Sequence, residues 1–167
     1  MAEHGVSASP IPSDPDGVPL FPKDLAGSLS HKDALCIAVV ARKVEFRSVG
    51  VDMERVESLA PDILRRFIRK DEESFIHNSG LAFPIAATVL WAAKEAFYKC
   101  IYPELRVKFG FLDIRVQCHG NALSVDSSVS LDVGSSVICG EFQSSGRYIF
   151  AGFWWRTPVQ TVSTRIY

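Results

Sequence analysis

The sequence lacks the features that mark several broad classes of protein. Its 18 Lys and Arg nearly cancel its 19 Asp and Glu, leaving a net charge of −1, so no general surface for nucleic acid or membrane is indicated. No apolar run approaches the length of a membrane span. Residues 1–12 have no basic region followed by an apolar one, as a signal peptide would. Internal repeats are also absent.

Cysteine and histidine are sparse and scattered. The four cysteines have no CxxC spacing, and the four histidines do not cluster with them at the spacing of metal ligands, which argues against a zinc site. We expect Cys36, Cys100, Cys118 and Cys139 to be reduced packing residues in a cytoplasmic protein.

The composition that remains is that of one globular domain. With 47% hydrophobic and 22% charged residues, the chain can bury a core of its own. Residues 1–24 are rich in Pro, Gly, Ser and Asp and predict an irregular leader. Residues 25–30 predict a short strand, and the nearly all-apolar residues 34–42 predict a buried one. We expect that buried strand to pair antiparallel with an acidic strand at residues 48–57.

Two helical regions follow, and then the period of the pattern changes. Ser58 can cap a helical region that extends to Ile76. Apolar residues then recur at a helical period from Pro84, which suits a first turn, to Pro103, which marks the expected end. From Phe111 the sequence has about four segments that alternate or run apolar, separated by Gly, Asn and Ser clusters. This pattern predicts about four antiparallel strands. The predicted fold class is α+β: an antiparallel sheet with a long helix packed across it.

The acidic strand carries two carboxylates on one face. Side chains alternate along a strand, so Asp52 and Glu54 point opposite to the apolar residues that flank them. Like charges on one strand face repel unless a cation lies between them. A solvated strand face is one interpretation, and a site for a hard cation is the other. For the second, Glu95 is the candidate third oxygen ligand, because Mg²⁺ takes a few carboxylates and completes its shell with water and phosphate.

The long helix carries the second polar group. At helical spacing Trp91, Glu95, Lys99 and Tyr102 lie on one face, at the edge of the buried stripe. An ordinary surface Glu–Lys pair, worth about 0.2–0.5 kcal/mol, is the simpler interpretation. A functional carboxylate and ammonium group is the alternative, and the acidic strand favours it.

Four motifs resemble those of the 4′-phosphopantetheinyl transferases, in the larger surfactin/enterobactin-synthetase type. They are GVDME at residues 50–54, WAAKEAFYK at 91–99, GSLSH at 27–31 and FGFLD at 109–113. The resemblance covers residues 10 to about 115 and continues more weakly to about Arg156. Three of these motifs in the right order make it specific, whereas any one alone would not.

The resemblance implies a reaction and a role for each matching residue. The family transfers the 4′-phosphopantetheine arm of coenzyme A to a serine of an acyl or peptidyl carrier protein and releases adenosine 3′,5′-bisphosphate. The enterobactin-type likeness favours carrier proteins of secondary metabolism, such as siderophore synthesis. The implied metal is Mg²⁺, with Mn²⁺ as the alternative, bound by Asp52, Glu54 and Glu95. Glu95 is the implied base and Lys99 the implied phosphate partner, kept charged by pairing with Glu95. The implied coenzyme A contacts are Ser30, His31, Lys94 and Lys99.

A basic run in the first helical region is a candidate docking surface. Arg65, Arg66 and Arg69 lie close together and are followed by three acidic residues. A solvated face with internal ion pairs is the simpler interpretation. Because carrier proteins are typically acidic, the resemblance favours docking of the carrier protein.

The chain departs from the family at its start. The family fold has two similar halves with the active site between them, and few residues precede GSLSH here. We therefore expect residues 25–47 to be the end of a first half, residues 48–157 a second half, and residues 158–167 a loose tail. Asp16 also replaces a basic residue before the Gly-x-Pro turn. A remnant that only binds coenzyme A or a carrier protein is the main alternative function. A metal-dependent nuclease is a remote one, because Lys94, Glu95 and Lys99 lie on a helix and not on a strand.

Overall fold

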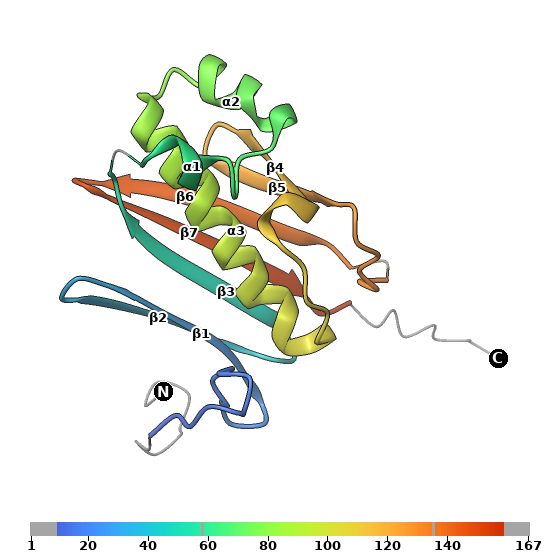
Figure 1. Cartoon of the computed structure of the whole chain (residues 1–167). Coiled ribbons are helices and arrows are strands. Elements are labelled where there is room, and N and C mark those ends of the chain that lie inside the picture. Colours follow the sequence, from blue (N-terminus) through green and yellow to red (C-terminus); the bar gives the residue numbers. More distant parts are fainter. Residues whose placement is uncertain (1–9, 58, 135, 159–167) are drawn as a thin grey trace.

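The chain folds as two antiparallel sheets with one long helix (Figure 1). The structure is a computed structural model that describes residues 10–57, 59–134 and 136–158. The strands are β1 (Leu25–Lys32), β2 (Leu35–Arg42), β3 (Phe46–Arg55), β4 (Ile114–His119), β5 (Ala122–Ser127), β6 (Ile138–Ser145) and β7 (Tyr148–Arg156). The α-helices are α1 (Pro61–Leu64), α2 (Glu73–Asn78) and α3 (Phe83–Leu105), with 3₁₀ turns η2 (Lys70–Glu72) and η3 (Phe111–Asp113).

The larger sheet has the order β3-β7-β6-β5-β4, and α3 lies across it. Strands β4 to β7 form the predicted antiparallel meander, and β3 pairs with the last of them. The expected α+β fold, with a long helix packed across an antiparallel sheet, is therefore confirmed. No helix in the described part of the chain is long and apolar enough to cross a membrane.

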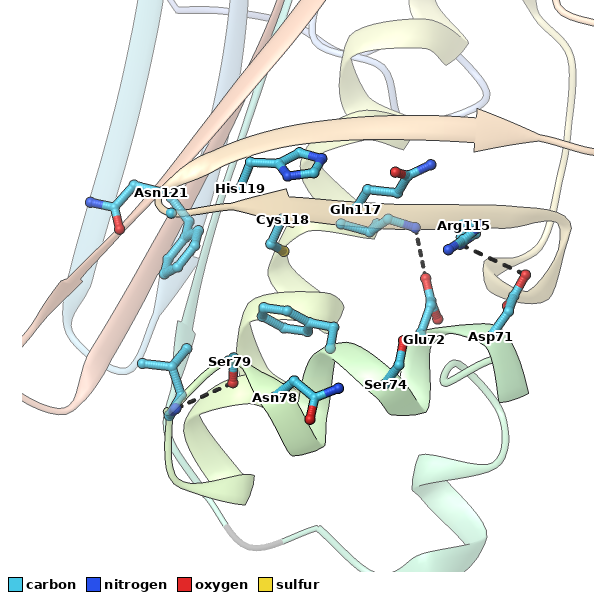
Figure 2. A pocket seen from close by; sticks show the side chains of 15 residues that line it. Asp71, Glu72, Ser74, Asn78, Ser79, Arg115, Gln117, Cys118, His119 and Asn121 are labelled. Carbon is cyan, nitrogen blue, oxygen red and sulfur yellow. Dashed lines mark hydrogen bonds and ion pairs between the residues drawn. The ribbon is translucent and has the colours of Figure 1, made fainter.

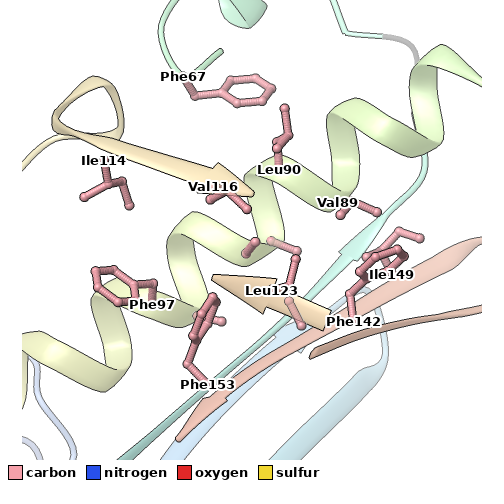
Figure 3. Packing of buried hydrophobic residues seen from close by; sticks show 14 of the residues in the cluster. Phe67, Val89, Leu90, Phe97, Ile114, Val116, Leu123, Phe142, Ile149 and Phe153 are labelled. Atoms are coloured by element: carbon pink, nitrogen blue, oxygen red, sulfur yellow. The ribbon is translucent and has the colours of Figure 1, made fainter. Parts of the chain in front are cut away.

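The core lies between α3 and the sheet (Figure 3). Val89, Leu90 and Phe97 of the helix are buried there against Ile149 and Phe153 of β7. The helix presents small side chains where it crosses β3. A β-carbon added to Gly50 would lie only 2.1 Å from the carbonyl oxygen of Ala96 and 2.4 Å from the amide nitrogen of Cys100. Gly50 thus lets the helix backbone approach the strand that carries Asp52.

The two N-terminal strands differ from expectation. β1 pairs with β2 in a separate two-stranded sheet, so the expected pairing of β2 with β3 is wrong. β1 instead lies beside β3, where the Ser28 hydroxyl accepts a hydrogen bond from the Val51 amide at 3.1 Å. β2 has no buried residue despite its apolar sequence, so the expectation of a buried strand is wrong; within the described residues only β1 and β3 contact it substantially.

The helices also differ in detail from the periodic pattern. The region expected to be helical up to Ile76 is broken into α1, η2 and α2, because the carbonyl of Phe67 and the amide of Arg69 bond to side chains instead of to a helix ladder. Ser58, the expected cap, lies outside the described residues. α3 continues past Pro103 to Leu105, since a proline in the last turn removes only one bond of the ladder.

Two of the cysteines fit the expected packing role and one does not. Burial raises the pKa of the Cys100 and Cys118 thiols to about 12, so these groups stay protonated. Cys36 is exposed on β2, and the expectation that it packs is wrong. All four cysteine thiols are free.

Candidate active site

Asp52 is at the centre of the site, buried on β3. Its Oδ1 atom accepts hydrogen bonds from the Ser30 hydroxyl and from Lys99 Nζ, both at 2.7 Å. Its Oδ2 atom is also buried but has no hydrogen-bond partner in the structure. A buried carboxylate oxygen without a donor is costly. Asp52 is thus held in place through one oxygen and presents the other for a further positive group.

Glu95 faces Asp52 from α3. Burial raises the pKa of the Glu95 carboxyl above its ordinary value of 4.5, and the charges of Asp52 and Glu54 raise it further, while Lys99 lowers it. The close approach of helix and strand at Gly50 brings these groups together. Glu95 is therefore a carboxylate that binds a proton or a cation more readily than an exposed one would.

Lys99 pairs with a residue of β3 and not with a residue of its own helix. Its ammonium group pairs with Asp52 at 2.7 Å, with side chains 30% and 5% exposed respectively. The expected pairing of Lys99 with Glu95, one turn away, is wrong. Because Asp52 comes from another element, the pair fixes α3 against β3.

A cleft of about 740 Å³ opens beside these groups. Glu95 and Lys99 reach it from α3, and His31 reaches it from β1. Ser30 is not among the residues that line the cleft, and its hydroxyl donates to Asp52, so its expected coenzyme A contact stays a prediction. The turn that contains Asp16 and Gly17 supplies a further part of the wall.

Glu54 has an ion-pair partner of its own. It pairs with Lys32 at 2.6 Å and lines a smaller cavity with Trp91, outside the cleft. Among the described residues no group of three or more His, Cys, Asp or Glu side chains is placed to hold a metal ion. The expected three-carboxylate site is therefore not assembled among the described residues. The unpartnered Oδ2 of Asp52 and the raised pKa of Glu95, which the Asp52 charge contributes to, fit two carboxylates that would hold a divalent cation.

Lys94 is a structural residue, and the expected phosphate contact is wrong. Its side chain is fully buried, and Nζ contacts the Glu72 carboxylate at 2.7 Å and the carbonyl oxygens of Phe67, Phe111 and Ile114 at 2.6 to 3.2 Å. Burial lowers the pKa of Lys94, and the Glu72 carboxylate opposes that shift. An ammonium group with these acceptors has no donor left for a ligand.

Glu72 completes this buried network. Its two oxygens also accept hydrogen bonds from the amides of Val116 and Arg69, at 2.7 and 2.9 Å. Figure 2 shows Glu72 reaching toward the strand that carries Arg115 and Gln117, at a surface cavity of about 580 Å³. Lys94 and Glu72 therefore join α3, the segment before α2, and β4.

Two models of known protein families match this chain. A sequence model of the 4′-phosphopantetheinyl transferase superfamily matches residues 48–145. The chain belongs to this superfamily. A second model, of the 4′-phosphopantetheinyl transferase N-terminal domain, matches residues 1–41.

Individual relatives support both the family and the enterobactin type. The chain is 28% identical over 156 residues to the 4′-phosphopantetheinyl transferase Npt of Nocardia iowensis, covering 92% of this chain and 70% of that protein. It is 38% identical over 101 residues to enterobactin synthase component D of Salmonella typhi, covering 59% of this chain and 41% of that protein. The chain thus spans less than half the length of that second relative.

Solved structures support the fold. The chain resembles the ACPS–CoA complex of Chronobacterium ammoniagenes with a TM-score of 0.54 and 18% identity, covering 66% of this chain and 96% of that one. At this identity the likeness concerns the fold of the transferase superfamily and not a particular substrate.

The three arginines of the basic run in this phosphopantetheinyl transferase chain have different surroundings. Arg69 is engaged: its guanidinium contacts the Asp71 carboxylate at 2.9 Å and the Leu112 carbonyl. Arg65 and Arg66 are exposed on the turn that follows α1. Only these two remain candidates for docking a partner.

Several residues around the transferase cleft were not predicted from the sequence. Lys108 lines the cleft, and its only signal was its place in a basic turn after the helix. Tyr98 and Tyr102 line it too, stacked with ring centroids 5.0 Å apart. Arg106 of the same basic turn is bound instead to Asp14 at 2.6 Å.

Proposed function

We propose that this chain is a Mg²⁺-dependent 4′-phosphopantetheinyl transferase that moves the 4′-phosphopantetheine group of coenzyme A to a serine of an acyl or peptidyl carrier protein. The observation that carries the proposal is the Asp52 carboxylate. It is buried, held through one oxygen by Lys99 and Ser30, and left without a partner at the other. A buried anion of this kind, paired with a lysine that lines the cleft, suits the binding of a cation and a pyrophosphate.

The transfer reaction needs only a few side chains of the enzyme. The serine hydroxyl of the carrier protein forms a bond to the β-phosphorus of coenzyme A, and the bond from that phosphorus to the bridging oxygen breaks. Glu95 lines the cleft and takes the hydroxyl proton, directly or through water. Its raised pKa favours this role, because a base is most effective when its pKa is not far below the working pH.

The leaving group, adenosine 3′,5′-bisphosphate, carries the phosphate oxygen on which negative charge develops. Lys99 lines the cleft from the same helix face as Glu95 and supplies positive charge there. His31 and Lys108 line the cleft nearby and suit the remaining phosphate groups. When bound, Mg²⁺ would be held by Asp52 and Glu95 and would neutralise charge on the pyrophosphate oxygens.

The carrier protein is the proposed macromolecular partner. Arg65 and Arg66 are exposed on the segment before η2, and that segment is tied to α3 through Lys94 and Glu72. An acidic carrier protein bound to these arginines would therefore rest on the same rigid unit as Glu95. We expect charge attraction to set the association rate more than the final affinity.

The test is intact-mass spectrometry of an apo carrier protein incubated with the chain, coenzyme A and Mg²⁺. We expect a gain of one phosphopantetheine mass that is lost with EDTA and with the Glu95→Ala or Asp52→Ala variants. Circular dichroism of each variant controls for folding. No gain from a folded parent chain would overturn the transferase proposal and leave a remnant that binds coenzyme A or a carrier protein.

A further inference from the structure

Asp16 places a carboxylate in the wall of the cleft of about 740 Å³, whose proposed ligand carries several phosphate groups. Lys99 and Lys108 line the same cleft and suit those phosphates. The side chain of Asp16 is 49% exposed, so water and a ligand both reach it. Because like charges repel, this carboxylate bears on which part of the ligand carries a phosphate.

The turn that carries Asp16 is held by Asp14. The Oδ1 atom of Asp14 accepts hydrogen bonds from the amides of Asp16 and Val18, at 3.0 and 2.9 Å. The Gly17 amide donates to the Asp14 carbonyl at 2.9 Å, and Gly17 has a φ of 81°, which glycine adopts without strain. Asp16 is therefore a fixed part of the cleft wall.

Arg106 lies beside Asp16 but is paired with a different carboxylate. Its Nη1 atom lies 2.6 Å from Asp14 Oδ2 and 3.6 Å from Asp16 Oδ2. The longer distance is beyond the reach of a hydrogen bond. Asp14 thus occupies the guanidinium group, and the carboxylate of Asp16 keeps its oxygens for a ligand.

The proposed chemistry directs the nucleotide end of coenzyme A toward Asp16. The attacking and leaving oxygens lie roughly in line across the transferred phosphorus. Glu95 is the base for the attacking hydroxyl, and Lys99, one turn closer to the C-terminus of α3, meets the leaving oxygen. Tyr102 lines the cleft beyond Lys99. Arg106, which lies beside Asp16, caps the helix about 10 Å past Lys99. The leaving nucleotide therefore extends toward Asp16.

A carboxylate and a guanidinium group select opposite forms of a ribose. In dinucleotide-binding folds an Asp or Glu accepts a hydrogen bond from the free ribose hydroxyl of NAD, whereas an Arg accommodates the ribose phosphate of NADP. Coenzyme A carries a phosphate at the 3′ position of its ribose, and dephospho-coenzyme A carries a hydroxyl there. Asp16 offers an acceptor to the hydroxyl and repels the phosphate, while Asp14 keeps Arg106 from offsetting that repulsion.

We propose that Asp16 sets the co-substrate specificity of the cleft, so that this chain uses dephospho-coenzyme A as well as coenzyme A and binds it at least as tightly. The inference rests on the proposed function, because it takes the phosphopantetheine donor as the ligand of the cleft. The bonds made and broken are the same with either donor. With dephospho-coenzyme A, the leaving group is adenosine 5′-monophosphate in place of the bisphosphate.

The experiment is isothermal titration calorimetry of the full chain with each donor separately, at one ionic strength and with Mg²⁺ present. Asp16→Asn should tighten the binding of coenzyme A about tenfold and change that of dephospho-coenzyme A less than about threefold, because the 3′-phosphate alone is relieved of repulsion. Asp16→Lys should make coenzyme A the tighter ligand. Asp62→Asn is the matched control, since Asp62 is exposed on α1 and does not line the cleft. It removes the same charge and should leave both affinities unchanged.

Three outcomes would overturn the inference while the proposed function stands. The first is a parent chain that binds coenzyme A more tightly than dephospho-coenzyme A. The second is equal tightening of both ligands by Asp16→Asn, which would be a general effect of charge. The third is a carrier protein that gains the phosphopantetheine mass from coenzyme A but not from dephospho-coenzyme A. If the folded parent binds neither donor, the proposed function fails and the inference fails with it.

Discussion

Lys99 Nζ lies 2.7 Å from the Oδ1 atom of Asp52, which joins the C-terminal half of α3 to the acidic strand β3. This pairing makes Lys99 part of both the scaffold and the cleft. The consequences of changing it should therefore differ from those of changing a lysine that only lines the cleft.

Lys99→Met should slow phosphopantetheine transfer by about 10²–10³ in kcat, because it removes the positive charge beside the leaving phosphate. Lys108→Met is the matched control, since Lys108 lines the same cleft without contacting Asp52 in the structure. It should raise the KM for coenzyme A and leave kcat nearly intact. Steady-state kinetics with a saturating carrier protein distinguish the two. Equal effects on KM from both variants would contradict the assigned role of Lys99.

Glu95→Gln should make the metal-free protein more stable at neutral pH. The pKa of Glu95 is raised above 4.5 in the folded state, chiefly by burial, so the folded protein keeps a proton that the unfolded chain releases. Stability is therefore lost as the pH rises from the unfolded pKa through the folded one, and Gln escapes that loss. The difference in thermal unfolding should vanish well below pH 4.5. Added Mg²⁺ should stabilise the parent and not the variant.

Lys94→Met should destabilise the fold by about 3–5 kcal/mol, because Glu72 would remain as a buried charge without its partner. The side chains of both residues are fully buried. Lys94→Met combined with Glu72→Gln should recover part of the loss, since glutamine keeps an acceptor for a backbone amide without the charge. Urea unfolding of both variants measures this. A loss of less than about 1 kcal/mol for the single variant would show that the pair is not essential.

Gly50→Ala should weaken both the fold and the cation site. The new β-carbon would lie 2.1 Å from the Ala96 carbonyl oxygen, so α3 must shift away from β3, and Glu95 with it. We expect a loss of about 1–3 kcal/mol, as for other overpacked cores, and weaker Mg²⁺ binding. Gly110→Ala is the control, because its nearest neighbour would lie at an ordinary 3.5 Å. Equal Mg²⁺ affinity in the parent and Gly50→Ala would mean that the helix position does not set the site.

Arg65→Ala with Arg66→Ala should slow association of an acidic carrier protein and reduce its dependence on salt, with little effect on kcat. Arg69→Ala is expected to act differently. Its guanidinium contacts Asp71 and the Leu112 carbonyl, so its loss should lower stability more than it changes salt dependence. Stopped-flow association at several salt concentrations, with thermal unfolding, separates these cases. An unchanged salt dependence in the double variant would exclude the docking role.

Local patterns in the sequence determined the fold class, the long helix and the meander. Apolar residues at helical spacing and the change to alternation after Phe109 depend only on residues near one another in the chain. The same patterns could not settle the breaks within the first helical region, because side chains of Glu72 and Lys94 bond to backbone groups there. They also could not place the end of α3, because a proline in the last turn removes only one bond of the ladder.

The roles of the two lysines in one motif were decided by tertiary structure alone. Lys94 and Lys99 are five positions apart, about 140° around the helix, so they face different surroundings. One meets Glu72 and three carbonyl groups in the interior, and the other meets Asp52 beside the cleft. Likewise Glu54 shares a strand face with Asp52 in sequence but is paired with Lys32 in the fold. A motif specifies which charges a segment carries, whereas the partner of each charge comes from segments that only folding brings near.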